Sequence, residues 1–505
     1  MMVRATTVFP VLIPTLIAQP ITASNARAFA ALVTVAGNAL SKRLTQILTA
    51  LVKSVESEQD EETAEAVDEA VQALLGSISD AEGLNTLMML LLGWVKNDSP
   101  KRRISALKFF SIFCANTELD YEIYRVDWIR VLVPMLDDSN MDVVQAAWDA
   151  LDAFVKSLGK DDLESLSVPL RRALESTGAP GRHVPGLGLP KGLSPLLPII
   201  FAGLTTGSSE QREQSAYAIG DLVERTEESA LKPFTTQLTG PLIRVITQAT
   251  TYPPAVKSAI LSALTTLLAV VPAFVKPFFP QLQRTFVKAV QDPASLAVRN
   301  RAVEALGVLM KSHTRGDVLA TELLKEIRGI VFEDEAIAAS LVMALASVVK
   351  NSGANVGAAS RQAIVELVME SSGRSDSGQA HHGRYHICTA LTLELMICST
   401  ENYNTAIGQL FASLGDQPDV KPIIDAHILA NTPISPLASQ LLLAVVQNSP
   451  QTLITFKCAT SAVRKVVQSI GSDQPNVARP AREAKDVLKN SPPWKDDQSV
   501  QAAFA

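Results

Sequence analysis

Apolar residues recur along the chain with the spacing of one helix face, and the segments that carry them come in pairs. Each pair has the same plan: an apolar helix, a short polar break that often contains Asp, and a second helix with small residues on its packed side. A helix pair of this kind buries its apolar face only by stacking on its neighbours. Five such pairs begin at Leu87, Ile129, Pro195, Gly240 and Pro280.

The second helices of four pairs share a column of alanines, each followed by Leu or Ile. The steps from one alanine to the next are 68, 45 and 42 residues, and the two shorter steps match the repeat of about 40–47 residues in HEAT and armadillo units. The pattern therefore predicts an all-α fold, a HEAT/armadillo-type α-solenoid of stacked antiparallel helix pairs. The column consists of Ala150, Ala218, Ala263 and Ala305.

The longer step predicts an insertion between two repeats. Residues 159–192 combine a predicted helix with a loop so rich in Gly and Pro that no helix can continue through it. Polar composition predicts flexible segments from Ser371 and after Ser491. We therefore expect N-terminal repeats over 1–158, the insertion over 159–192, central repeats over 193–315, further HEAT-like repeats over 316–490 and a flexible tail over 491–505.

Composition narrows the class of protein. Hydrophobic residues make up 47% of the 505 residues and aromatic residues 5%, which is typical of close helix packing. The net charge of −6 argues against a surface made as a whole for nucleic acid. Four cysteines without a C-x-x-C pair are typical of reduced thiols, and the strongest membrane-span candidate, Leu84 to Val95, is too short. We therefore expect a cytoplasmic protein without disulfides or membrane insertion.

Candidate chemical sites are few. The chain has no G-x-x-x-x-G-K-[ST] phosphate loop and no G-x-G-x-x-G after a predicted strand. His382 and His386 would share a helix face near Cys388, but no further ligand at a diagnostic spacing completes a metal shell. The acidic run from Glu56 is explained by a solvated loop and a helix start, with docking of a basic partner as the alternative. We expect no catalytic residue, cofactor or metal, and a scaffold rather than an enzyme.

One segment departs from the acidic balance of the chain. From Lys232 to Arg301 there are eight Lys or Arg residues and one acid, Asp292. Some of these cations have a structural explanation, because one column of bases opens the second helices and can bond an Asp or the backbone carbonyls of a neighbouring turn. That column holds Arg103, Arg212, Lys257 and Arg299.

Other cations of this region are expected to point outward. Three lie on first helices outside the apolar stripe, and three lie in connections just before Pro or Gly. Stacking would bring them onto one surface, which could bind an acidic protein or a phosphate backbone. The helix positions are Arg244, Arg284 and Lys288, and the connection positions are Lys191, Lys232 and Lys276.

Three strings in the same region resemble a known family. They are the runs Gly188 to Thr226, Leu231 to Ile246, which contains LTGPLIR, and Val275 to Asp292, which contains PQLQRTFVK. These strings resemble the C-terminal HEAT block of the general-control activator scaffold, a large ribosome-associated protein. The opening segment is similar to that family as well, so the resemblance extends over residues 8 to 315.

The resemblance implies a non-catalytic scaffold that binds the RWD domain of the initiation-factor-2-alpha kinase and promotes its activation in the amino-acid starvation and stalled-ribosome response. The family proteins are several times longer and engage the ribosome through other regions, so the ribosome is the second expected partner. Neither a membrane nor a specific nucleic-acid sequence is expected. The repeat pattern alone also fits another scaffold, such as a transport adaptor or a cytoskeletal binder. The implied contact residues are Lys191, Arg212, Arg244, Lys276, Arg284 and Lys288, of which Arg212 also belongs to the structural column.

Overall fold

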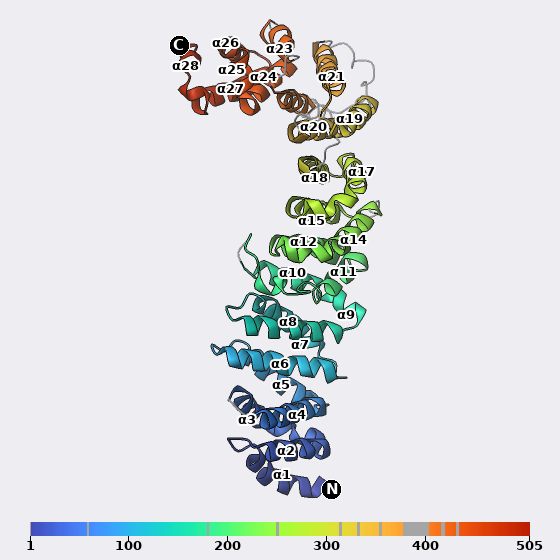
Figure 1. Cartoon of the computed structure of the whole chain (residues 1–505). Coiled ribbons are helices and arrows are strands. Elements are labelled where there is room, and N and C mark those ends of the chain that lie inside the picture. Colours follow the sequence, from blue (N-terminus) through green and yellow to red (C-terminus); the bar gives the residue numbers. More distant parts are fainter. Residues whose placement is uncertain are drawn as a thin grey trace. The chain divides into compact units, whose positions relative to one another are not determined.

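The computed structural model confirms the all-α prediction, because every regular element in the described part of the chain is a helix (Figure 1). These residues form two compact units, Met1–Phe274 and Val275–Ala505. The division falls inside the predicted central block over 193–315, and the other predicted boundaries stay predictions. The structure describes residues 2–57, 60–178, 181–248, 252–312, 316–330, 334–352, 356–376, 403–415, 420–430 and 434–504.

In the first unit, helices form pairs and the pairs stack through their second helices. Helix α3 packs against α4, α5 against α6 and α7 against α8, while α6 contacts both α4 and α8. Such nearest-neighbour packing is the solenoid arrangement. The helices are α1 (Met2–Leu16), α2 (Ala23–Ala36), η1 (Gly37–Arg43), α3 (Leu44–Glu56), α4 (Glu61–Ser77), α5 (Ala81–Trp94), α6 (Pro100–Asn116), α7 (Glu122–Met135), α8 (Met141–Lys156), α9 (Lys160–Ser165), α10 (Ser167–Glu175), η2 (Pro185–Gly188), α11 (Leu197–Thr205), α12 (Ser209–Glu224), α13 (Glu228–Leu231), η3 (Lys232–Phe234), α14 (Thr235–Thr247) and α15 (Pro254–Val270).

Helix α8 shows why these segments fold as the pattern predicts. The Asn140 side chain accepts hydrogen bonds from the backbone N–H groups of Asp142 and Val143 at 2.9 and 3.2 Å, which caps the helix start. Its apolar residues recur every three or four positions and are buried. Phe154 of this face packs near Phe110 of α6, whose ring stacks on Trp128 of α7 with centroids 3.5 Å apart. One aromatic cluster therefore joins three consecutive helices of the stack.

The predicted insertion over 159–192 contains an extra helix pair and a packed loop. The expected single helix is divided into α9 and α10, of which α9 packs against α11 while α10 packs against α7 and α12. In the loop that follows, the Val184 N–H donates to the Arg225 carbonyl and the Gly186 N–H donates to the Leu136 carbonyl, each at 2.9 Å. The long step between alanines thus adds one more layer to the stack, and the Gly/Pro-rich loop is bonded to its neighbours.

The second unit repeats the plan. Helix α17 pairs with α18, α19 with α20 and α26 with α27, and α18 stacks on α20. A further helix covers 403–413. The other helices are α16 (Pro272–Val275), in which the division falls, η5 (Lys276–Phe278), α17 (Phe279–Val290), α18 (Leu296–Ser312), α19 (Gly316–Ile330), α20 (Glu335–Ser352), α21 (Ala358–Asp376), α23 (Val420–Ile423), the π-helix η7 (Ile424–Leu429), α24 (Pro436–Asn448), α25 (Pro450–Thr455), α26 (Ala459–Ile470), α27 (Pro475–Asn490), η8 (Trp494–Asp496) and α28 (Gln498–Ala502).

The end of the chain, predicted as a flexible tail, is folded over residues 491–504. The Trp494 side chain is 1% exposed, and its indole N–H donates to the Val446 carbonyl of α24 at 3.2 Å. The Gln501 amide donates to the Leu488 carbonyl of α27 at 3.0 Å. Burial of one large aromatic side chain outweighs the polar composition around it. Most of the other predicted flexible segment, with its histidines and Cys388, lies outside the described residues.

Helix α20 is, taken alone, long and apolar enough to cross a membrane. Within the second unit, however, 67% of it is buried, and it contacts α17, α18 and α19. That degree of burial is what a core helix of a stacked array requires.

Candidate protein-binding surface

The column of bases predicted at the start of the second helices acts as a set of structural caps. Arg103 of α6 donates from Nη1 to the carbonyls of Asn97 and Asp98 at 2.9 and 3.0 Å. Arg299 of α18 is 7% exposed and donates from Nη1 to the Asp292 carbonyl at 2.9 Å. Each acceptor lies just beyond a first helix, where carbonyls have no partner in the helix. The structural prediction is confirmed for these two members.

Arg212 belongs to the same set. Its Nη1 donates to the carbonyls of Leu204 and Thr205 at 3.0 and 2.8 Å. Its guanidinium also lies 4.9 Å from the centroid of the Tyr252 ring, a cation–π contact. Arg212 was also implied as a partner contact, and that part of the expectation stays a prediction, whereas the two bonds from Nη1 give the residue a structural function.

The cations predicted on the outer face of α14 are exposed. Arg244 projects from a helix whose opposite side buries Leu242 and Val245. Helix α14 contains no Asp or Glu. Lys232, in the turn before the helix, is also exposed, and its ammonium lies 5.5 Å from the centroid of the Phe274 ring. The outer face of α14 therefore carries positive charge that no carboxylate on the same helix balances.

Helix α17 of the second unit has the same character. Arg284 and Lys288 are exposed and four residues apart, so they share one side of the helix, while Leu282 and Phe286 are buried on the other. Lys276, in the turn before α17, is exposed as well. The helix contains no acid, and within the described ranges none of the three cations lies within ion-pair distance of a carboxylate.

Helix α7 is a first helix whose arginines form ion pairs with carboxylates of the fold. Its Arg125 is an ion-pair partner of Asp120 at 2.9 Å and of Asp162 at 2.6 Å. Its Arg130 lies 3.5 Å from Asp127. Arg125 thus joins two neighbouring segments, whereas Arg284 and Lys288 of α17 remain available to a partner.

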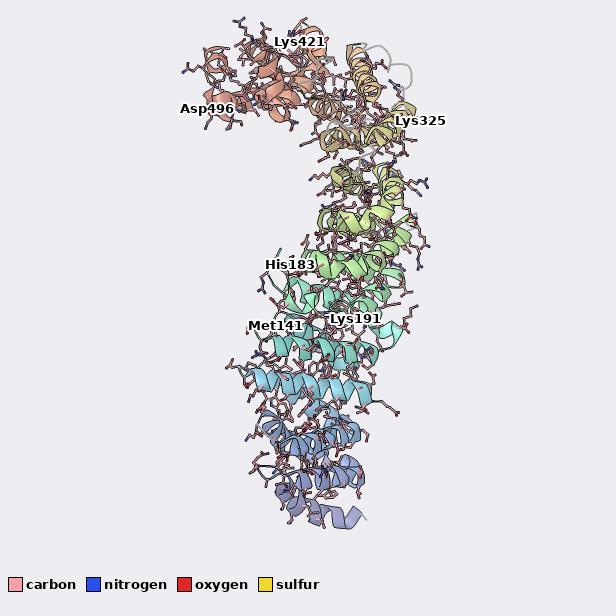
Figure 2. All side chains as sticks on the ribbon, in the orientation of Figure 1. Met141, His183, Lys191, Lys325, Lys421 and Asp496 are labelled. Carbon is pink, nitrogen blue, oxygen red and sulfur yellow. The ribbon has the colours of Figure 1, made fainter. Side chains whose placement is uncertain are left out.

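Lys191 stands apart from the helical positions. It is exposed in the connection before α11, with φ of 62°, and its neighbour Gly192 accepts a hydrogen bond from the Trp148 indole at 3.2 Å (Figure 2). Lys191, Arg212 and Arg244 belong to the first unit, and Lys276, Arg284 and Lys288 belong to the second. The predicted set is thus divided between the two units, and the single continuous surface stays a prediction.

One exposed cation was missed from sequence. Lys325 projects from α19 (Figure 2), and Gln283 of α17 donates to Glu322 of α19 at 3.0 Å, which shows that the two first helices are adjacent. The repeat that begins near Leu319 has a weaker apolar pattern than its neighbours. Because Glu322 and Glu326 offset the charge of Lys325, the net charge of this segment does not stand out as basic. Lys325 is thus a further exposed cation on a first helix of the second unit.

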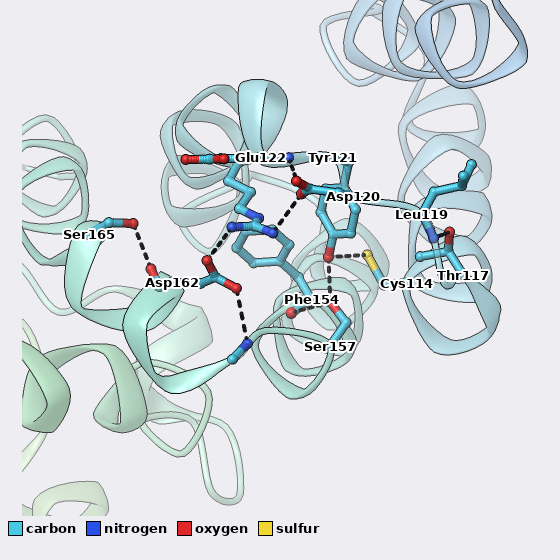
Figure 3. A network of polar contacts seen from close by, with 12 residues as sticks. Cys114, Thr117, Leu119, Asp120, Tyr121, Glu122, Phe154, Ser157, Asp162 and Ser165 are labelled. Carbon is cyan, nitrogen blue, oxygen red and sulfur yellow. Dashed lines mark hydrogen bonds and ion pairs between the residues drawn. The ribbon is translucent and has the colours of Figure 1, made fainter. Parts of the chain in front are cut away.

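A polar network around Tyr121 joins a phenol, a thiol and a hydroxyl in the first unit (Figure 3). The Tyr121 hydroxyl lies 3.7 Å from Cys114 Sγ and also contacts the Ser157 hydroxyl. Burial raises the pKa of the Cys114 thiol to about 12, and burial also raises the pKa of the Tyr121 phenol above its usual range. Both groups stay protonated near neutral pH, so this cluster serves packing and not nucleophilic chemistry.

Metal-binding chemistry also has no candidate in the described part of the chain, where no group of three or more His, Cys, Asp or Glu side chains could hold an ion. The two cysteines in the described part of the chain, Cys114 and Cys458, are buried and free. The acidic run is used in the fold: Asp60 caps α4 and Glu56 binds Arg102 at 2.8 Å.

Stacked helix pairs with arginine-capped turns define this chain as a HEAT-repeat solenoid. The profile of the family described as stalled ribosome sensor GCN1-like, HEAT repeats, matches residues 8–191. The eIF-2-alpha kinase activator GCN1 of Saccharomyces cerevisiae is 38% identical over 368 residues, which cover 73% of this chain and 14% of that protein. The resemblance stated from the sequence is thereby confirmed: this is a chain of GCN1-like HEAT repeats.

A second relative is similar over a comparable share of the chain. The stalled ribosome sensor GCN1 of Homo sapiens is 34% identical over 379 residues, which cover 74% of this chain and 14% of that protein. The chain thus spans about one seventh of the length of these relatives. Among solved structures, the Kap95:Nup1 complex aligns with a TM-score of 0.43 at 14% identity, covering 99% of this chain and 67% of that chain.

Proposed function

We propose that this chain is part of a non-catalytic scaffold that binds the RWD domain of the kinase of translation initiation factor 2 alpha and promotes its activation when ribosomes stall. The similarity to proteins described as an eIF-2-alpha kinase activator and a stalled ribosome sensor, over almost three quarters of the chain, supports this function. The ribosome is proposed as a second partner, engaged by the longer family protein, and the cytoplasm as the place of both contacts.

The observation that carries the docking site is the outer side of α17, a helix whose own residues include no acid. Arg284 and Lys288 are exposed there without a carboxylate partner among the residues described. A partner carboxylate can therefore bind them without first breaking an ion pair, and their field would speed the approach of an acidic surface. We assign the main contacts to Arg284 and Lys288, with Lys276 in the turn before their helix, and we propose Arg244 and Lys191 of the first unit as further contacts. Arg212 is a secondary contact in this proposal, because its Nη1 already donates to two carbonyls of the fold.

The test is binding of the purified full chain to an isolated RWD domain of the kinase. The double variant Arg284→Glu, Lys288→Glu should weaken the complex by about tenfold or more, which corresponds to about 1.4 kcal/mol or more. Raised salt should weaken the unmodified complex in the same direction, because both partners are solvent-exposed charges.

The matched control is the double variant Arg301→Glu, Lys311→Glu on α18, which makes the same change of charge at two other exposed positions. It should bind the RWD domain as the unmodified chain does. Absence of any complex with the unmodified chain would overturn the proposal and favour another HEAT scaffold, such as a transport adaptor or cytoskeletal binder. Equal loss in both double variants would overturn the assigned contact site.

A further inference from the structure

Five serines of the chain directly precede a proline, and Ser99 differs from the other four in its surroundings. Ser99 is exposed in the turn between α5 and α6, with an extended backbone of φ −73° and ψ 120°. Its hydroxyl makes no hydrogen bond to any residue that the structure describes, although it occupies the N-cap position of α6. The other four are half-buried and are Ser194, Ser435, Ser449 and Ser491.

Two of the other four hydroxyls are already used in the fold. Ser435 accepts from the Ala438 N–H at 3.2 Å and so caps α24. Ser449 donates to the Ala412 carbonyl. A kinase could reach these hydroxyls only after the local structure had opened. Ser99 needs no such opening, because its side chain is neither covered nor bonded.

The residues after Ser99 also differ from those after the other four. Pro100 is followed by Lys101 and Arg102, whereas no charged residue occurs within three positions after any of the other four serines. Proline-directed protein kinases select a serine followed by proline, and several of them use acidic residues in the substrate groove to select a cation two or three positions further on. Ser99 is thus the one serine of the five that combines exposure with this complete pattern.

We propose that Ser99 is a phosphorylation site for a proline-directed protein kinase that uses Mg·ATP. In the reaction Ser99 Oγ attacks the γ-phosphorus, and the bond from that phosphorus to the β–γ bridging oxygen breaks. The hydroxyl proton passes to the catalytic base of the modifying kinase, and ADP leaves. This kinase is distinct from the initiation-factor kinase, and the proposal does not depend on the function proposed above.

The start of α6 is suited to hold the product. Its first turn contains Lys101, Arg102 and Arg103 and no acid, an arrangement unfavourable to the helix dipole unless an anion is present. A phosphate at the N-cap can accept from the backbone N–H groups at the second and third helix positions, which no side chain caps here. Arg102 and Arg103 follow Ser99 by three and four residues, so they lie on its side of the helix.

The same two arginines link α6 to the repeats before and after it. Arg102 binds Glu56 at 2.8 Å, and Arg103 binds Asp138 at 3.0 Å. A phosphate at Ser99 adds an anion that the uncapped N–H groups of the first turn and the exposed Lys101 can bind, while the two existing ion pairs keep that turn in place. Phosphorylation is therefore expected to stabilise the first unit.

The experiment is incubation of the purified full chain with a proline-directed kinase and Mg·ATP, followed by site mapping by mass spectrometry. We expect one phosphate, at Ser99. Ser99→Ala should abolish it, Pro100→Ala should reduce the rate by about tenfold, and Ser194→Ala should leave it unchanged. A synthetic peptide of residues 95–104 establishes that the kinase is active.

Modification of the peptide but not of the chain, or modification of another serine in the chain, would overturn the site. The phosphorylated chain should also melt about 2 °C or more above the unmodified chain. A melting temperature that is unchanged or lower would overturn the capping role, and circular dichroism of Ser99→Ala checks that this variant is folded.

Discussion

Arg284 and Arg299 belong to the same helix pair but differ in their surroundings. The Arg299 guanidinium is buried and donates to the Asp292 carbonyl and to the Ser340 hydroxyl, each at 2.9 Å. The Arg284 guanidinium is exposed, and within the part of the chain that the structure describes it has no partner. Substitution of Arg299 should change the stability of the fold, and substitution of Arg284 should change only binding at the surface.

The first prediction concerns this pair of arginines. Arg299→Ala should lower the free energy of unfolding by about 2–3 kcal/mol, because it leaves a buried carbonyl and hydroxyl without their charged donor. Arg284→Ala should change it by less than about 0.5 kcal/mol. Denaturant unfolding followed by circular dichroism measures both variants. Equal effects would mean that the buried arginine is not a structural cap.

The second prediction concerns a cap that titrates. Asp60 accepts from the N–H and the hydroxyl of Thr63, each at 2.9 Å, and these bonds lower the pKa of Asp60 from 3.8. Since the folded pKa lies below the unfolded one, its stabilisation is present above pH 3.8 and is lost as the pH falls through the folded pKa. Asp60→Asn keeps an acceptor that does not titrate. As the pH is lowered below 3.8, the melting temperature of the Asp60→Asn variant should therefore fall less steeply than that of the unmodified chain.

The sequence predicted the function of a residue when that function recurs at one position of the repeat. The column that contains Arg103 and Arg299 follows from alignment of the second helices, and the structure bears it out. The alignment could not show that the Arg212 guanidinium lies over the Tyr252 ring, because that contact depends on how the next helix pair stacks. The exposure of Arg284 was predictable from the apolar stripe of its helix. Lys325 was recognised as a further exposed cation only from the structure, in which α17 and α19 are adjacent.

At the scale of elements, the Gly/Pro-rich loop before α11 differs most from its prediction. Its composition rules out a helix through 176–192 but does not show that the loop packs. Backbone bonds from Val184 and Gly186 attach it to the ends of α12 and α7. The helix before the loop is also too short for a clear repeat signal, so the α9–α10 pair could not be distinguished from an insertion. Likewise, polar residues around Trp494 concealed a buried anchor.

The third prediction tests this packing with two neighbouring glycines. A Cβ at Gly186 would lie 2.7 Å from Leu136 Cβ and 2.9 Å from the Leu136 carbonyl oxygen, whereas a Cβ at Gly188 would meet nothing within 4 Å. Gly186→Ala should therefore destabilise the chain by about 1–3 kcal/mol. Gly188→Ala should be neutral or slightly stabilising. Denaturant midpoints compare the two, and tolerance of Gly186→Ala would indicate a loop that is not held against α7.

At the scale of the whole molecule, each unit is a stack of helix pairs that presents exposed first-helix cations. The capping arginines bond carbonyls in the turns between paired helices. The exposed cations on the outer sides of α14 and of α17 have no such structural function and can contact a partner. Because each unit of a stacked array contacts mainly its neighbours, surface substitutions should act locally. Charge reversal on α17 should thus alter binding without unfolding the chain, which separates the proposed contact from the fold that carries it.

The most direct test of this account is amine-reactive labelling of the full chain, with and without a saturating RWD domain of the kinase. Lys276 and Lys288 should be labelled about threefold less in the complex, because bound surface excludes the reagent. Lys156 and Lys311, which are exposed on the second helices α8 and α18, should be labelled as before. Unchanged labelling of Lys276 and Lys288 at saturation, or protection found only on the second helices, would contradict the account.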